Sequence, residues 1–150
     1  MMSLRRLLSI LPLIFAWPLT LPAQANSPFE GKWVFNAEKS VFSPSPLPRS
    51  ETLTFANGTV TVEGVNPQGK PFVFSWTPLP GKAVPVTGGR PELTVETKES
   101  GDILVHMWSD QSGTSYGEGQ ISADGKIMRY VLIGTRWGNH VYEVSVFNKQ

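Results

Sequence analysis

The chain has no cysteine among its 150 residues. This absence excludes disulfide bonds, a thiolate nucleophile and a cysteine-ligated zinc ion, so ordinary packing must stabilise the fold. Charged residues are also scarce, at 17%, and 13 Lys and Arg nearly balance 12 Asp and Glu. Without a basic cluster, the chain offers no surface that would hold the phosphates of a nucleic acid. We therefore expect no nucleic-acid partner.

Long hydrophobic runs are absent as well. The apolar run at residues 7–17 is far shorter than the ~20 residues that cross a bilayer as a helix. It follows Arg5 and Arg6 and precedes Ala23-Gln24-Ala25, which is the order of charged start, apolar middle and small-residue cleavage site in a secretory signal peptide. We expect residues 1–25 to be cleaved and residues 26–150 to form one domain without a stable membrane anchor. The mature protein is then periplasmic or secreted.

Motifs for catalysis or metal binding are few. The two histidines, His106 and His140, have no second ligand at the spacing that metal sites use. Residues 113–117 match the Gly-x-Ser-x-Gly pattern of hydrolases. That pattern requires a strand-to-helix turn, whereas here it begins a strand-like run, so we interpret the match as chance. We predict a non-catalytic protein with no metal site and no cofactor.

Short alternating runs separated by turn residues fill the rest of the chain, the pattern of an antiparallel all-β domain. The candidate strands are residues 29–35, 51–56, 59–65, 70–77, 83–87, 92–98, 103–109, 114–122, 126–133 and 140–147. Closure into a barrel removes exposed strand edges. We therefore predict a meander that closes into a barrel of 8–10 strands, with a two-sheet β-sandwich as the alternative.

The turn residues Asn57-Gly58 predict the register of one hairpin. This dipeptide favours a two-residue type I′ turn. Because side chains alternate between the two faces of a strand, such a turn places Leu53, Phe55, Val60 and Val62 together on one apolar face.

A second hairpin is expected around residues 99–101. A three-residue loop there pairs Val95 with Val105 and gives an inner face that is almost wholly apolar. A two-residue loop would instead mix His106 and Trp108 with Val95. Hydrophobic patterning favours the three-residue loop, so we expect His106 and Trp108 to point outward.

Residues 36–49 do not resemble a strand, because three alternating prolines at 44, 46 and 48 deny donors to a backbone ladder. We expect this segment to cross to the second strand without pairing. It is either a plain edge crossover or a lid that carries Val41, Phe42 and Leu47 over the barrel mouth, with Phe42 as its apolar anchor.

The start of the predicted domain resembles a known family. Gly31-x-Trp33 matches the Gly-x-Trp that opens the first barrel strand of lipocalins and related calycins. The longer string through Asn36, Lys39 and Ser40, together with residues 122–126 (Ser-Ala-Asp-Gly-Lys), is similar to secreted bacterial lipocalin-like proteins of uncharacterised function. The resemblance implies a barrel. The lipocalin Thr-Asp-Tyr motif and disulfide cysteines are missing here, so it does not carry over lipocalin ligand chemistry.

One contact is expected at the closed end of the barrel, between Trp33 and Arg129. A three-residue loop at 123–125 pairs Gly119 with Arg129 and places the arginine on the apolar face, where it could stack on the Trp33 ring. The lipocalin resemblance also implies an arginine packed on the Gly-x-Trp tryptophan. The alternative is an exposed Arg129 paired with Glu143.

The apolar inner face carries the function prediction. We predict that the barrel binds a small hydrophobic molecule in its interior. The residues expected to line that interior are Phe42, Leu53, Phe55, Val60, Val62, Phe72, Phe74, Trp76, Leu93, Val95, Val105 and Met107. The alternative is a filled barrel without ligand that acts on a secreted protein partner, for example as an enzyme inhibitor. An internal cavity of ~300 Å³ or more favours the first of these.

Overall fold

The computed structural model describes residues 27–150. The predicted signal peptide, residues 1–25, lies outside these described residues. Within 27–150, no helix is long and apolar enough to cross a membrane.

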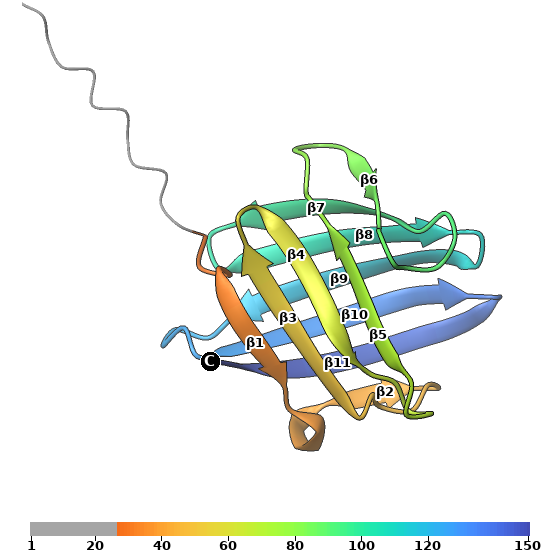
Figure 1. Ribbon diagram of the computed structural model, residues 1–150, viewed down its shortest axis with the longest axis horizontal. Coiled ribbons are helices and arrows are strands. Elements are labelled where there is room, and N and C mark those ends of the chain that lie inside the picture. The colour runs from red at the N-terminus through yellow and green to blue at the C-terminus, as the bar shows by residue number, and fades with distance from the viewer. Residues whose placement is uncertain (1–26) are drawn as a thin grey trace, which may run out of the picture.

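Eleven strands form one antiparallel sheet (Figure 1). They are β1 (Gly31–Phe35), β2 (Val41–Ser43), β3 (Ser50–Ala56), β4 (Thr59–Val65), β5 (Pro71–Trp76), β6 (Ala83–Pro85), β7 (Thr94–Ser100), β8 (Ile103–Asp110), β9 (Gly113–Ile121), β10 (Ile127–Arg136) and β11 (Asn139–Lys149). One 3-10 turn, η1 (Ala37–Lys39), follows β1. The strand order β5-β4-β3-β1-β11-β10-β9-β8-β7-β6 is that of a meander whose first strand pairs with its last.

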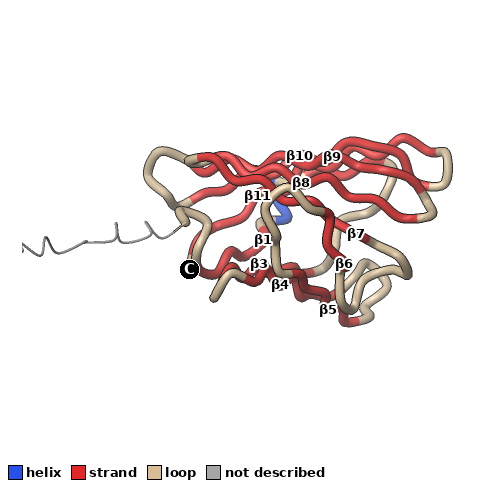
Figure 2. The backbone as a smooth tube through the Cα atoms, turned by 90° about the horizontal axis from the view of Figure 1, so that it is seen from above, coloured by secondary structure: helices blue, strands red, loops and turns tan. Residues whose placement is uncertain are grey.

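The sheet curls into a nearly closed barrel, which confirms the predicted fold class. Strand β1 joins the two halves by pairing with both β3 and β11. The remaining edge strands are β5 and β6. They are bridged where Ser75 of β5 and Thr87, which follows β6, exchange two backbone hydrogen bonds of 2.9 Å. Seen from above, β8 to β11 form one side of the barrel and β1, β3, β4 and β5 the other (Figure 2). A sandwich of two separate sheets is therefore wrong.

The segment before the prolines pairs with the sheet, contrary to expectation. Strand β2 runs along β11, with Phe42 opposite Glu143. Ser40 fixes its start, because the Ser40 hydroxyl donates to the Asn36 carbonyl (2.7 Å) and accepts from the Val146 amide (2.9 Å). The prolines begin only at Pro44, so residues 41–43 keep the amide donors that a ladder requires.

The β3–β4 register is confirmed. Asn57 and Gly58 form the turn with φ values of 52° and 74°, both positive as a type I′ turn requires. Phe55 lies opposite Val60 and Leu53 opposite Val62. All four side chains are buried, as the alternation of side chains predicts.

The predicted β7–β8 register is wrong by three residues, because Val95 lies opposite Trp108 and not opposite Val105. Ser100 pairs with Ile103, so the connection is the two-residue turn Gly101–Asp102. Gly101 has φ 60° at the first central position, where type II′ turns place glycine. The slip reverses every side chain of β8. His106 and Trp108 face the interior, whereas Met107 is 46% exposed outside and Val105 faces outward with it.

The β9–β10 register also differs from the prediction. The amide of Ser122 donates to the carbonyl of Ile127 (2.8 Å), which closes a four-residue loop in place of three. Asp124 holds this loop, because its Oδ1 accepts from the Ser122 hydroxyl (2.6 Å) and from the Lys126 amide (3.1 Å). Arg129 therefore pairs with Gln120 and is exposed on the outer surface, away from Trp33. The predicted Trp33–Arg129 stack is wrong, and so is the alternative pair with Glu143, whose partner is Arg136.

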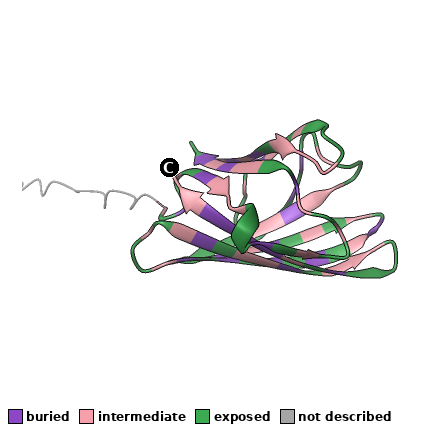
Figure 3. Cartoon of the chain, turned by 90° about the horizontal axis from the view of Figure 1, so that it is seen from below, coloured by how far each residue is buried: buried purple, intermediate pink, exposed green. Residues whose placement is uncertain are grey.

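Trp33 closes one end of the barrel without an arginine. Its side chain is completely buried and its Nε1 donates to the carbonyl of Phe29 (2.7 Å). The ammonium of Lys149 lies 4.9 Å from the centre of the Trp33 ring, which is cation–π distance. Buried and exposed positions alternate along the strands of the barrel, most regularly along β9 (Figure 3).

Candidate functional site

A cavity of about 900 Å³ lies inside the barrel. Seven of the predicted lining residues face it: Phe42, Leu53, Val62, Phe72, Phe74, Trp76 and Leu93. Phe55 and Val60 line a different pocket, Val95 is buried in the core, and Val105 and Met107 lie on the outside. Small residues explain why large side chains leave this space open. Ser115 and Ser145 line the cavity from β9 and β11, and Gly88 and Gly89 line it from the β6–β7 loop.

One wall of the cavity is a continuous aromatic surface. Phe72, Phe74 and Trp76 alternate along β5 and their rings stack, with centroids 6.1 and 6.3 Å apart. Trp108 extends this surface from β8 and meets Trp76 edge-on at 5.0 Å. We refer to these four residues as the aromatic wall. Such a wall offers a flat apolar area that suits a ring system or an alkyl chain.

A hydrogen-bonded chain of three side chains lies beside the aromatic wall. Trp108 Nε1 donates to the hydroxyl of Tyr130 (3.0 Å), and that hydroxyl lies 3.1 Å from Nδ1 of His106. Burial lowers the pKa of His106 to about 3, so the imidazole is neutral. The Tyr130 hydroxyl accepts from Trp108, and its own hydrogen finds an acceptor among the described residues only if it donates to Nδ1. We therefore place the imidazole hydrogen of His106 on Nε2. Within residues 27–150, Nε2 has no hydrogen-bond partner.

Two carboxyl groups and a guanidinium face the same cavity. Arg136 Nη1 pairs with Glu143 Oε1 at 3.4 Å. Burial raises the pKa of Glu143, and Arg136 acts against that rise. Glu51 lies on β3, and burial together with the charge of Glu143 raises its pKa to about 7. Among the described residues, the Glu51 carboxylate forms no hydrogen bond or ion pair.

The sequence interpretation missed these polar residues, although one signal was available. Glu51 shares the parity of Leu53 and Phe55, which were placed on the inner face, so the same argument predicts that Glu51 points inward. His106 and Tyr130 were missed because the predicted registers were off by three residues at β7–β8 and by one at β9–β10, and a shift by an odd number of residues exchanges the two faces of a strand.

The serine of the Gly-x-Ser-x-Gly match lies within β9. Ser115 is buried and lines the cavity, and the strand continues to Ile121 without a helical turn. A nucleophile elbow requires a strained turn from a strand into a helix. Ser115 therefore lacks the local geometry of that motif.

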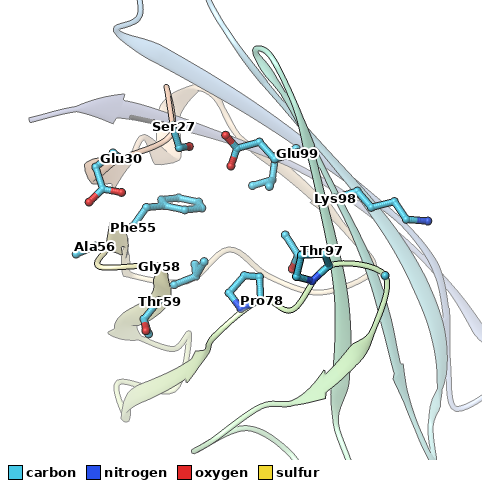
Figure 4. Close-up of a pocket in the computed structure, with 14 residues that line it drawn as sticks. Ser27, Glu30, Phe55, Ala56, Gly58, Thr59, Pro78, Thr97, Lys98 and Glu99 are labelled. Atoms are coloured by element: carbon cyan, nitrogen blue, oxygen red, sulfur yellow. The ribbon is translucent and has the colours of Figure 1, made fainter. Parts of the chain in front are cut away.

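A second, smaller pocket of about 520 Å³ lies at the opposite end of the barrel, beneath the β3–β4 turn. The Phe55 ring points into it, and the side chain of Lys98 extends away from it (Figure 4). Leu104 lines both this pocket and the interior cavity. We place the candidate site in the interior cavity, because that cavity is larger and combines apolar walls with polar groups.

Comparison with known proteins shows the fold alone. No protein-family model and no curated protein matches this sequence. The chain is similar to the crystal structure of the fluorescent protein UnaG, with 15% sequence identity, a TM-score of 0.50, and coverage of 81% of this chain and 97% of UnaG. A point variant of UnaG matches with the same identity and TM-score, covering 82% of this chain and 96% of the variant. The described chain thus shares the antiparallel β-barrel fold of UnaG.

Proposed function

We propose that this protein binds a small hydrophobic molecule in the interior cavity of its barrel. The cavity of about 900 Å³ is the observation that carries the proposal. Sites for small molecules are typically concave, mostly apolar and about 300–1,000 Å³ in volume, with a few polar groups that orient the ligand. The alternative of a filled barrel does not agree with this cavity.

The mouth of the cavity supports access for a ligand. Phe42 from β2 lines the cavity together with Asn66 and Gln68 of the β4–β5 loop and residues 88–90 of the β6–β7 loop. Gly88 has φ 77°, and a Cβ atom there would collide with the backbone at Val73. The β4–β5 and β6–β7 loops thus border the opening of the cavity. Loops rearrange more readily than a hydrogen-bonded sheet, which would let a ligand enter.

We extend the proposal to a non-catalytic carrier that acts in the periplasm or outside the cell. The support for secretion is the order of Arg5 and Arg6, the apolar run 7–17 and Ala23-Gln24-Ala25. Determining the N-terminus of the protein purified from a periplasmic fraction tests this part. A start at Asn26 is expected, and an intact Met1 in that fraction would contradict it.

Fluorescence of the neutral hydrophobic dye Nile Red tests ligand binding. We expect dye emission to rise on binding, with a matching change in tryptophan emission, because Trp76 and Trp108 line the cavity. Phe74→Ala should weaken binding at least fivefold, since it removes the centre of the aromatic wall. Val73→Ala is the matched control, because Val73 is on the same strand and 58% exposed outside. Equal effects of the two substitutions would count against a site in the interior.

One observation favours a protein partner as a second candidate function. Met107, Tyr116, Ile133 and Tyr142 are successive cross-strand neighbours on the outer face of β8 to β11. Each is between 37% and 49% exposed. An exposed apolar row of this kind is typical of an interaction surface. Ile133→Lys should then abolish partner binding and leave Nile Red binding unchanged, whereas loss of dye binding would assign the residue to the fold.

A further inference from the structure

We infer that the ligand of the interior cavity is a hydrophobic amine, whose protonated nitrogen lies against the carboxylates of Glu51 and Glu143 while its apolar body rests on the aromatic wall. This inference rests on the proposed function, because it names the class of molecule that the same cavity accepts. It is carried by the carboxylate of Glu51, which has no ion-pair partner among the described residues, and by the aromatic wall that lines the same cavity.

One carboxylate at the cavity has no ion-pair partner among the described residues. Of the four charged side chains that line the cavity, Arg136 is paired with Glu143, and Arg90 is paired at 2.7 Å with Asp110, which lies outside the lining. Both guanidinium groups are thus engaged elsewhere, and Glu51 is left without a counter-charge. A charge held away from water without a partner is costly, and the group either takes up a proton or recruits an opposite charge.

An organic cation supplies the missing charge. Its ammonium donates N–H hydrogen bonds to a carboxylate and cancels the repulsion between Glu51 and Glu143, which is evident in the raised pKa of Glu51. An anionic ligand would add a negative charge beside Glu51 and would leave that carboxylate without a counter-charge. The buried Nε of Arg136 has no partner among the described residues, and an uncharged acceptor atom on the ligand could fill that place while Nη1 keeps its contact with Glu143.

The aromatic wall fits the same class of ligand. Tryptophan and phenylalanine rings attract an ammonium group over their faces and cover an alkyl chain or ring with apolar surface. Phe72, Phe74 and Trp76 present such faces side by side in one stacked row. The cavity therefore combines negative charge with an apolar surface that tolerates positive charge.

A second feature of the cavity indicates a ligand independently of the carboxylates. His106 is 2% exposed and lines the cavity, and its Nε2 lacks a hydrogen-bond partner within the described residues. Buried polar atoms in folded proteins are nearly always paired. Because we place the imidazole hydrogen on Nε2, a bound molecule would partner this atom through an acceptor, such as an oxygen, that is separate from its ammonium group.

Three ligands of equal chain length distinguish the outcomes: dodecylamine, dodecanol and dodecanoic acid, each measured at pH 8 by displacement of Nile Red. We expect dodecylamine to bind at least tenfold more tightly than the other two. Glu51→Gln keeps the shape of the side chain and should reduce dodecylamine affinity at least tenfold while leaving dodecanol unchanged. Glu63→Gln is the matched control, because Glu63 is exposed on the outer face of β4.

The possible results separate the two proposals. If dodecanol or dodecanoic acid binds as tightly as the amine, or if Glu51→Gln has no effect, the amine inference is overturned and the proposed function stands. If none of the three ligands and no Nile Red binds, the proposed function itself is overturned. Preference for the amine that depends on Glu51 supports both.

A pH series on the unsubstituted protein gives a test that needs no variant. Dodecylamine stays protonated between pH 8 and pH 5.5, as alkyl amines titrate near pH 10. The charged and titratable groups that line the cavity with Glu51 are Glu143 from β11, Arg136 and Tyr130 from β10, His106 from β8, and Arg90 from the β6–β7 loop, which stays protonated throughout this range. Of these groups, only Glu143 also takes up a proton as the pH falls, and its protonation removes negative charge from the cavity just as protonation of Glu51 does. When the pH is lowered from 8 to 5.5, Glu51 loses its negative charge, so the affinity for dodecylamine should fall at least fivefold and the affinity for dodecanol should stay the same. Equal changes in the two affinities would overturn the inference.

Discussion

The hydroxyl group of Tyr130 occupies the place where a Cβ atom on Gly117 would stand. Gly119, two residues further along β9, lies under the same ring, and a Cβ there would come within 3.2 Å of Tyr130 Cδ2. The absence of two side chains on β9 thus makes room for one large side chain from β10. Through its hydroxyl, that side chain holds Trp108 and His106 in place beside the cavity.

Gly117→Ala should therefore destabilise the protein by about 1–3 kcal/mol, the usual cost of overpacking a close-packed interior. Chemical denaturation measures the loss. Removing the hydroxyl in Gly117→Ala/Tyr130→Phe should recover part of it, because the added methyl group then has space. If the two single substitutions are additive, the contact between residues 117 and 130 does not limit stability.

Stability should depend on pH through two buried groups of opposite effect. Glu51 has its pKa raised from 4.5 to about 7, so the folded state binds the extra proton and stability increases as pH falls from 8 to 6.5. His106 has its pKa lowered from 6.5 to about 3, so the unfolded state binds the extra proton and stability decreases as pH falls below 6.5. Between pH 6.5 and 4.5 the two effects oppose each other.

Denaturation curves of Glu51→Gln separate these effects. The variant should be more stable than the parent by about 1–3 kcal/mol at pH 8, because it no longer buries a charge. Its stability should be flat from pH 8 to 6.5 and then decline, by at most about 1.4 kcal/mol per pH unit. A variant that follows the parent curve at every pH would show that Glu51 is not shifted.

Lys149, rather than Arg129, should stabilise the closed end of the barrel. Lys149→Ala removes the cation above the Trp33 ring and should cost about 0.5–1 kcal/mol. Arg129→Ala is the natural control, since Arg129 is exposed on the outer face, and should change stability by less than about 0.5 kcal/mol. A double-mutant cycle with Trp33→Phe measures the coupling, and a larger effect at Arg129 than at Lys149 would refute this assignment.

Phe42 should control the release of a bound ligand. Its ring lines the cavity and packs edge-on against Phe35 at 6.1 Å from the short strand β2. Phe42→Ser should raise the dissociation rate of Nile Red several-fold in stopped-flow measurements, at a cost in stability of about 1 kcal/mol. An unchanged dissociation rate with a loss of about 3 kcal/mol or more would instead identify Phe42 as a core residue.

The apolar pattern of the sequence failed to predict the register of two hairpins, β7–β8 and β9–β10. Both concern a choice between hairpin loops that differ by one residue, and in each the apolar pattern favoured the wrong loop. At β8 the pattern placed Val105 inside, whereas Gly101 at the first turn position determines that His106 faces inward. Hydrophobic patterning assumes an apolar interior, and this interior contains a hydrogen-bonded polar network.

Local chemistry in the sequence determined the all-β class, the approximate positions of the strands other than β2, and the Asn57-Gly58 hairpin. The reason is that the two-residue alternation of a strand and the φ values of a turn depend on neighbouring residues alone. Only the tertiary structure decided the site. Glu51 and Glu143 come together from β3 and β11, and Trp108 and Tyr130 from β8 and β10, so each meeting depends on how the whole sheet closes. A shift of one residue in any strand between them exchanges the inner and outer side chains, and the balance of packing around the entire barrel selects among such shifts.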